Sequence, residues 1–328
     1  MTIAYHASHE QFPPSVLLEL SELAQACGFN AISSSDHFHP WSERQGENGF
    51  SFAWLGAALQ STTLPYSVVC APGQRYHPAI VAQAIATLNE MFPGRLSVAL
   101  GSGEALNESI TGDKWPEKSL RNARLLECYQ IISRLLDGEE VNHRGLVNVE
   151  NARLYTLPKE KPLLFCAAVS LETARWAGEW ADGLLTTHKP HHELEKVVQA
   201  FRSNGGAGKP IHLKVQLSYS RAKEEAEAGA YHQWRSNIFQ GSVLGELPTV
   251  AHFDAAAQLV KPADMEEHVR ISSSLVQHKN WIEQDLSLGI DRVILHNVNR
   301  NQKEFIEDFG AEVLPNLRFL NGNLLAIR

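Results

Sequence analysis

Eight short runs of strand-forming residues recur along the chain, and each is followed by a longer helical pattern. The strand runs cover residues 3–6, 31–34, 66–70, 96–100, 163–167, 183–186, 213–217 and 292–296. The helical patterns cover residues 15–27, 52–60, 78–91, 117–136, 171–180, 194–201, 276–288 and 303–314. Eight strand and helix pairs are what a (β/α)8 TIM barrel requires, whereas a doubly wound sheet usually has about five to seven strands. The alternation therefore predicts an α/β fold of the barrel type.

Two stretches exceed what a barrel needs. A barrel accounts for about 250 residues, and the chain has 328. Within the segment 137–160, residues 141–157 alternate like a β-hairpin, and residues 219–270 show no strand pattern and are rich in Ala, Glu and His. We expect one domain over residues 1–328, with a hairpin insertion and a helical insertion that covers one end of the barrel.

Composition narrows the class of protein. Hydrophobic residues make up 44% of the chain and charged residues 20%, which indicates a globular protein. The net charge of -8, without a run of like charges, argues against a nucleic-acid partner or an anionic membrane surface. Because no 18 consecutive residues are apolar and the N-terminus does not read as a signal peptide, we expect a cytoplasmic protein without a membrane span. Four widely spaced cysteines predict reduced thiols.

In a (β/α)8 barrel the active site lies at the C-terminal ends of the strands. Asp36 and His37 follow the second predicted strand. A carboxylate near a histidine can set its tautomer and raise its basicity. Adjacent residues on an extended segment point to opposite sides, so Asp36 could instead bind a cofactor while His37 faces the substrate. Glu104, after the fourth strand, is either an acid on a flexible turn or a carboxylate that caps the next helix.

Several other chemistries lack their motifs. The first strand and helix unit has no three-glycine dinucleotide fingerprint, and no GxSxG follows a strand. His37 and His39 lie two residues apart, but no HExxH or paired CxxC occurs, so we predict no metal site. Trp41 could stack on a flat ligand or close the barrel, and Lys189 could hold an anionic group or be solvated.

Four segments in order, residues 7–12, 35–41, 75–84 and 101–108, resemble the luciferase-like flavin and deazaflavin oxidoreductases. The resemblance is greatest to the branch that contains F420-dependent glucose-6-phosphate dehydrogenase. It covers most of the first 190 residues at matching spacing and is looser in the last third. It implies a (β/α)8 barrel whose open end holds an isoalloxazine or deazaflavin ring.

The resemblance also implies roles for individual residues. His37 would be the base that removes a substrate hydroxyl proton, and Glu104 would be the acid that serves the reduced ring. The reacting face would be lined by Trp41 and Glu10. Substrate would meet Thr186 and Lys189. The cofactor would contact Asp36, Ser102, Gly103 and Asn107. Its phosphate would bind at the start of the helix that begins after Val169 and Ser170. Its ring would rest on a bulge at Val68, Val69 or Cys70, where the family often has a cis peptide.

Some positions differ from those of the glucose-6-phosphate dehydrogenase branch, and these differences affect which cofactor and which substrate we expect. Val169 and Ser170 stand where the glucose-6-phosphate enzymes have a glycine pair. Lys189 could match a lysine that binds the sugar phosphate in those enzymes. A second phosphate-binding lysine of those enzymes aligns near Asp254, whose negative charge would repel the phosphate. Residues 5–12, 40–46 and 71–76 look more like a side branch that uses FMN.

The sequence therefore favours an FMN-dependent oxidoreductase or monooxygenase that acts on a small organic substrate, with a homodimer expected from the family. The first alternative is an F420-dependent dehydrogenase for a sugar phosphate or alcohol, and the second is a noncatalytic flavin-binding protein. Monooxygenase and dehydrogenase reactions use the same pocket, so this choice stays open.

Overall fold

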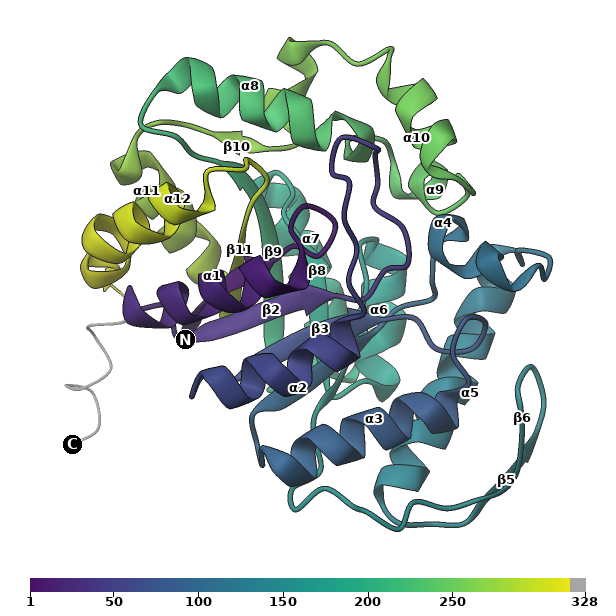
Figure 1. Ribbon diagram of the computed structural model, residues 1–328. Coiled ribbons are helices and arrows are strands. Elements are labelled where there is room, and N and C mark those ends of the chain that lie inside the picture. The colour runs from purple at the N-terminus through teal and green to yellow at the C-terminus, as the bar shows by residue number, and fades with distance from the viewer. Residues whose placement is uncertain (319–328) are drawn as a thin grey trace.

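Eight parallel strands close into a barrel in the computed structural model, which describes residues 1–318 (Figure 1). The barrel strands are β1 (Thr2–Ala7), β2 (Ala31–Ser35), β3 (Tyr66–Cys70), β4 (Leu96–Leu100), β7 (Leu164–Ala167), β8 (Gly183–Thr187), β9 (Ile211–Ser218) and β11 (Arg292–Asn297). They pair in chain order, and the barrel closes because β11 pairs with both β1 and β9 while β9 pairs with β8. The predicted (β/α)8 TIM barrel is confirmed.

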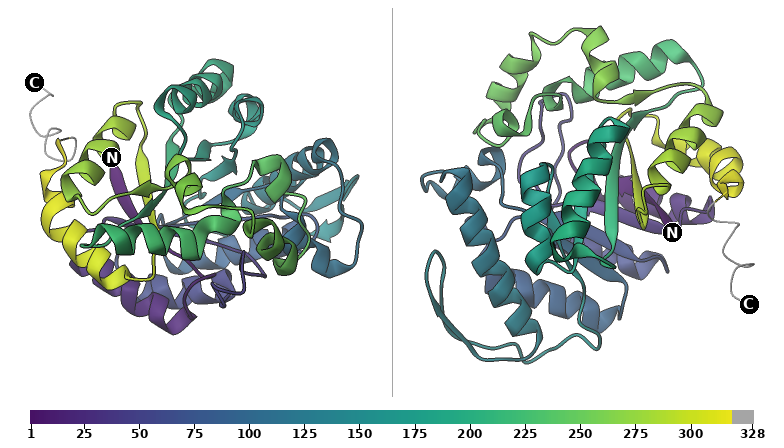
Figure 2. Two further views of the ribbon diagram at one scale, coloured as in Figure 1. Left: turned by 90° about the horizontal axis from the view of Figure 1, so that it is seen from above. Right: turned by 180° about the vertical axis from the view of Figure 1, so that it is seen from behind.

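Helices follow each strand and lie outside the barrel (Figures 1 and 2). They are α1 (Pro14–Ala26), α2 (Ser51–Ser61), α3 (Pro78–Met91), α5 (Lys118–Leu136), α6 (Leu171–Trp180), α7 (His191–Phe201), α11 (Leu275–Leu286) and α12 (Gln302–Asp308). Pro78 opens α3 at a position where its missing N–H costs nothing, and the His77 ring accepts a hydrogen bond from Ala79 N at 3.2 Å.

Two details of the helices differ from the sequence expectation. A short helix, α4 (Ala105–Glu108), follows β4 directly and was not predicted, because four residues carry too little periodicity to be recognised. The last predicted helix ends early: α12 stops at Asp308 and continues as a π-helical turn, Phe309–Val313, instead of running as α-helix to Leu314.

Side chains alternate between the two faces of the barrel wall. On β3, Tyr66, Val68 and Cys70 belong to the large core between strands and helices. A small apolar cluster, Ala4, Ala31 and Ile294, packs inside the barrel. Two residues further along these strands, the inward positions are polar: His6, Ser33 and His296. The barrel interior therefore changes from apolar to polar toward the C-terminal ends of the strands, which are here called the mouth.

Both predicted insertions are present. Strands β5 (Val141–Arg144) and β6 (Asn148–Ala152) form the expected antiparallel hairpin, which projects from the edge of the molecule in Figure 1. The longer insertion contains α8 (Lys223–Trp234), α9 (Gly241–Leu244), α10 (Val250–Ala257), the 3-10 turn Pro262–Glu267 and the two-residue strand β10 (Arg270–Ile271). The expectation of no strand there is wrong only for β10, since two residues leave no readable pattern.

The longer insertion packs over the mouth. Phe253 of α10 meets Trp41, from the loop after β2, and Leu106 of α4 in one apolar cluster. Both partners belong to segments that leave the C-terminal ends of barrel strands. Figure 1 shows the inserted helices, in green, beside the purple loop that follows β2. None of the helices within residues 1–318 has the length and apolar character to cross a membrane.

Candidate functional site

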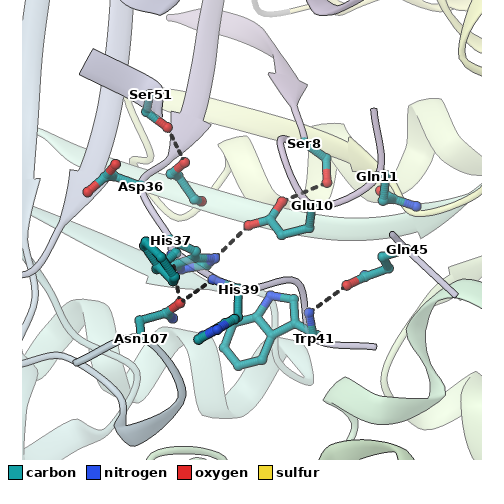
Figure 3. A network of polar contacts seen from close by, with 12 residues as sticks. Ser8, Glu10, Gln11, Asp36, His37, His39, Trp41, Gln45, Ser51 and Asn107 are labelled. Atoms are coloured by element: carbon teal, nitrogen blue, oxygen red, sulfur yellow. Dashed lines mark hydrogen bonds and ion pairs between the residues drawn. The ribbon is translucent and has the colours of Figure 1, made fainter. Parts of the chain in front are cut away.

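A carboxylate–histidine pair lies at the mouth, with Glu10 buried and His37 partly exposed (Figure 3). Glu10, in the turn after β1, places Oε1 2.6 Å from His37 Nδ1, and Ser8 Oγ donates to Glu10 Oε2 at 2.8 Å. Because Nδ1 is engaged by a carboxylate, the neutral ring carries its proton there and leaves Nε2 as an acceptor. Nε2 makes no hydrogen bond to any described residue, so it is available to a ligand.

Asp36 does not contact the ring of His37. Arg75 Nη2 donates to Asp36 Oδ2 and to the Asp36 carbonyl, both at 2.9 Å. Arg75 also binds Glu108, through its backbone N at 2.8 Å and its Nε at 3.4 Å. The alternative in which Asp36 sets the tautomer of His37 is therefore wrong, since Glu10 does so from a different strand end. Asp36 Oδ1 is buried and makes no hydrogen bond in the described chain.

The surroundings at the mouth shift the pKa values of His37, Glu10 and Glu104 in different directions. Burial lowers the pKa of His37, but the hydrogen bond and charge of Glu10, helped by Glu104, outweigh burial and raise it above the ordinary value. Burial also acts to raise the pKa of Glu10, yet the His37 contact holds that pKa well below its usual range. Burial raises the pKa of Glu104. The two carboxyl groups are thus shifted in opposite directions, Glu10 toward the ionised form and Glu104 toward readier protonation.

Asn107 and Trp41 shape the loop after β2. Asn107 Oδ1 accepts hydrogen bonds from Phe38 N at 2.8 Å and His39 N at 3.1 Å, which ties that loop to α4. The Trp41 indole stands edge-on to the His37 ring, with centroids 5.1 Å apart and planes at 83°. His39 turns away, its Nδ1 2.9 Å from Leu106 O. The indole therefore walls one side of the His37 ring.

The end of β3 places a valine, Val69, on the inner wall of the barrel. Val68 points outward into the core, whereas Val69 is half-buried and faces the barrel interior. The expected bulge and cis peptide do not occur: β3 pairs in unbroken register with β2 and β4, and every described peptide bond is trans.

The turn after β4 contains Gly103, which has φ +81°. A Cβ at this position would lie 2.9 Å from Glu108 Cγ, so glycine is required. Ser102 Oγ accepts from Lys118 Nζ at 2.6 Å.

The remaining predicted site residues lie farther along the barrel rim. Val169 is half-exposed, and Ser170 caps α6 by accepting a hydrogen bond from Thr173 N at 3.2 Å. Thr186 is buried, and alternation from the inward Leu185 points it toward the helices, away from the mouth. Lys189 is half-buried, and burial lowers its pKa.

Lys214 and the Arg75–Glu108 contact were missed in the search along strand ends. Lys214 lies inside strand β9, where inward polar residues His212, Lys214 and Gln216 alternate with core residues Leu213, Val215 and Leu217. That alternation is the signal that could have found it. Its Nζ lies 3.4 Å from Ser35 Oγ, directly below the Asp36–His37 segment.

Comparisons with known proteins agree with this architecture. Residues 1–292 match the family model described as "Luciferase-like monooxygenase". The F420-dependent glucose-6-phosphate dehydrogenase of Microbacterium testaceum (strain StLB037) is 32% identical over 341 residues, covering 97% of this chain and 98% of that protein.

Solved structures show the same fold. An F420-dependent secondary alcohol dehydrogenase, in complex with an F420–acetone adduct, is 28% identical with a TM-score of 0.89, covering 97% of this chain and 99% of that one. A riboflavin lyase with modified FMN and riboflavin, 16% identical with a TM-score of 0.74 over 98% of this chain and 92% of that one, shows the fold alone. The chain therefore belongs to the luciferase-like monooxygenase family and is an oxidoreductase.

Proposed function

We propose that the chain is an F420-dependent dehydrogenase that interconverts a small alcohol and its carbonyl compound. The observation that carries the proposal is the Glu10–His37 contact at 2.6 Å, which leaves Nε2 of His37 free at the same mouth as Glu104. The two relatives above 25% identity described above are named F420-dependent, whereas the neighbour whose name includes FMN is 16% identical. This support favours F420 over the FMN that the sequence motifs suggested.

The residues at the mouth fit a flat polar ring. Asp36 Oδ1 is buried without a hydrogen bond of good geometry, although the Tyr76 hydroxyl interacts with this carboxylate, so a ring N–H could satisfy Oδ1. Val69 is half-buried and offers an apolar surface on the inner wall. The carboxyl of Glu104 makes no hydrogen bond within the described residues. A deazaflavin with polar edges and an apolar face meets all three needs.

His37 and Glu104 have distinct roles in this proposal. Bound F420 supplies the ring that exchanges hydride with the substrate carbon. His37 Nε2 accepts the proton that the alcohol loses, and Glu10 stabilises the imidazolium that results. Burial raises the pKa of Glu104, so its carboxyl takes up a proton more readily than an exposed glutamate does and can pass it to a ligand at the mouth. Trp41 and the inserted helix α10 limit water around His37.

The charges near the mouth support an unphosphorylated substrate. Asp254 already binds three groups of the loop after β2: Ser42 Oγ at 2.7 Å, Glu43 N at 3.0 Å and Arg44 Nη1 at 3.0 Å. Arg270, at the end of the insertion, is held by both oxygens of Asp285 at 2.6 and 2.8 Å. These guanidinium groups are committed to carboxylates, so of the cations discussed here Lys189 alone would face a phosphate dianion on the rim, and one lysine balances only part of that charge. We therefore propose a small uncharged secondary alcohol rather than a sugar phosphate.

Two measurements test the proposal. Fluorescence titration of the purified chain with F420 and, separately, FMN should show tight saturable binding of F420. Anaerobic assays should show F420 reduction by small secondary alcohols and little reduction by glucose 6-phosphate. No binding of F420, or turnover only with a phosphorylated sugar, would contradict the proposal.

His37→Gln should reduce kcat by about 10²- to 10⁴-fold, because it removes the general base. F420 binding should stay within about threefold of the wild type, since the Arg75–Asp36 contact is untouched. Single-turnover absorbance of F420 measures the first quantity and fluorescence the second. Equal turnover by wild type and variant would contradict the role of His37. Absent turnover by both, with F420 bound, would favour a noncatalytic binding protein.

A further inference from the structure

Arg75, in the loop between β3 and α3, has a side chain that is only 6% exposed and is bound on several sides. Its Nη2 donates to the carbonyl and to Oδ2 of Asp36, both at 2.9 Å, and its Nη1 donates to the Tyr76 hydroxyl at 3.0 Å. Its Nε and its backbone N both donate to the carboxylate of Glu108, at 3.4 and 2.8 Å. All three guanidinium nitrogens are therefore engaged.

The two acidic partners of Arg75 belong to different walls of the mouth. Asp36 follows β2 and lies directly before the histidine that is the proposed base. Glu108 is the last residue of α4, and its side chain packs against the turn that precedes this helix, because a Cβ at Gly103 would lie 2.9 Å from Glu108 Cγ. Glu104 is the next residue in that turn. Arg75 thus joins the segment after β2 to the segment after β4.

The contacts of Arg75 depend on the shape of its guanidinium group. The side chains of Asp36 and Glu108 are almost fully buried. Burial raises the pKa of both carboxyl groups, and the Arg75 guanidinium opposes the rise in each case. A guanidinium group is a planar fork whose nitrogens bind partners on different sides, whereas a lysine ammonium group is a single point of charge. A lysine at this position would therefore keep the charge but could not hold both carboxylates in the same way.

We infer that Arg75 is a positioning residue that holds the segment after β2 and the turn after β4 at a fixed separation, so that the cofactor ring enters a mouth that is already formed. The inference rests on the proposed function, in which the ring lies against both segments. A preformed site binds more tightly than one that its ligand must order, because the cost of ordering is subtracted from the binding free energy. Arg75 acts on the ring through Asp36 and Glu108.

The experiment compares Arg75→Lys, Arg75→Met and Glu108→Gln with the wild type. Fluorescence titration should show that Arg75→Lys raises the Kd for F420 by about ten- to hundredfold, and Arg75→Met by at least as much. Glu108→Gln weakens the same link from its other end and should raise the Kd by about three- to tenfold. Hydrogen exchange in the absence of cofactor should increase in residues 36–41 and 101–108 of all three variants, because both walls are released.

The matched control is Arg95→Lys. Arg95 directly precedes β4, at the end of the barrel opposite the mouth, and its guanidinium donates to the backbone carbonyls of Leu59, Thr62 and Leu64 at distances of 2.8 to 3.0 Å. This variant loses the same kind of contact and should lower the melting temperature. It should leave the Kd for F420 within about twofold of the wild type, because neither wall of the mouth is touched.

Saturation kinetics separate positioning from stability. With F420 saturating, the kcat of Arg75→Lys should stay within about threefold of the wild type, because Glu10 still fixes His37. A loss of folded protein would instead lower kcat and leave the Kd of the folded fraction unchanged.

An unchanged Kd in folded Arg75→Lys and Glu108→Gln would overturn the inference. A wild type that binds FMN but not F420 would contradict the proposed function, and the same comparison of Kd values is then made with FMN. A wild type that binds neither ring would contradict both.

Discussion

Glu10 controls the chemistry of the mouth at the scale of single residues. It contributes one short contact to His37 and receives a second bond from Ser8, so its carboxylate is fixed in place. A Glu10→Gln substitution removes the charge and nearly keeps the shape of the side chain, so it tests the electrostatic effect of Glu10 on His37.

Glu10→Gln should move the acidic limb of kcat/KM to lower pH. Glu10 raises the pKa of His37, so its loss lowers that pKa, and the ring stays neutral further into acid. The plateau rate should fall by about 10²-fold or more, since a weaker base with an unfixed tautomer accepts the proton less readily. A pH series of steady-state rates measures both. The control, Glu139→Gln, removes an exposed pair with Arg134 and should change neither quantity; a limb that moves to higher pH would refute the assignment.

At the scale of elements, α6 shows how tightly the outer helices pack. Gly178 lies on the face of α6 that meets the end of α7 and the turn after it. A Cβ there would lie 2.5 Å from Asn204 O and 2.7 Å from Phe201 O. Backbone oxygens cannot move aside without shifting the helix, so the residue must lack a side chain. Ser170, at the start of the same helix, caps it through Thr173 N.

Gly178→Ala should lower the free energy of unfolding by about 1–3 kcal/mol, the usual cost of overpacking. The matched control is Gly56→Ala in α2 (Ser51–Ser61), where a Cβ would find its nearest neighbour, Leu88 Cδ2, at 4.0 Å. That change should instead stabilise the fold by about 0.5–1 kcal/mol, because alanine loses less backbone entropy in a helix. Urea denaturation measures both. Equal effects of the two substitutions would show that the α6–α7 contact is not tight.

At the scale of the whole molecule, the longer insertion is joined to the loop after β2. Asp254 of α10 binds Ser42, Glu43 and Arg44 of that loop, and Phe253 packs on Trp41 beside His37. Segments more than 200 residues apart in sequence thus share one wall of the mouth. The insertion contacts the site through this loop, and it also reaches the turn after β1, where Gln11 Nε2 donates to Gln233 Oε1 of α8 at 3.0 Å.

Asp254→Ala should raise KM by roughly three- to tenfold, because the loss of contacts worth about 1 kcal/mol loosens the loop that carries Trp41. Hydrogen exchange should increase in residues 38–50, and the melting temperature should change little. Asp264→Ala is the control: Asp264 accepts from Lys261 N within the same insertion and does not touch the loop. Unchanged KM together with unchanged exchange in Asp254→Ala would show that the insertion does not shape the mouth.

Local patterns predicted the barrel because periodicity is a property of each segment. The two-residue and 3.6-residue periods placed all eight strands, and the positions after β2 and β4 indicated His37, Trp41, Glu104 and Asn107 as mouth residues. The two insertions were also recognisable in the sequence, since they interrupt the alternation of strands and helices. Thr186 and Val68 show the limit of this approach: each lies on a barrel strand that ends at the mouth, but each faces the helices.

The sequence by itself determined the number, order and type of the elements, the strand ends that carry polar residues, and the resemblance to a flavin and deazaflavin family. Only the tertiary structure decided which carboxylate contacts His37. Asp36 is adjacent in sequence but turns to Arg75, whereas Glu10, 27 residues away, reaches the ring. The physical reason is that barrel closure brings separate strand ends together and points alternate residues inward. That geometry brings Glu10, His37, Glu104 and Lys214 from four separate segments to one end of the barrel.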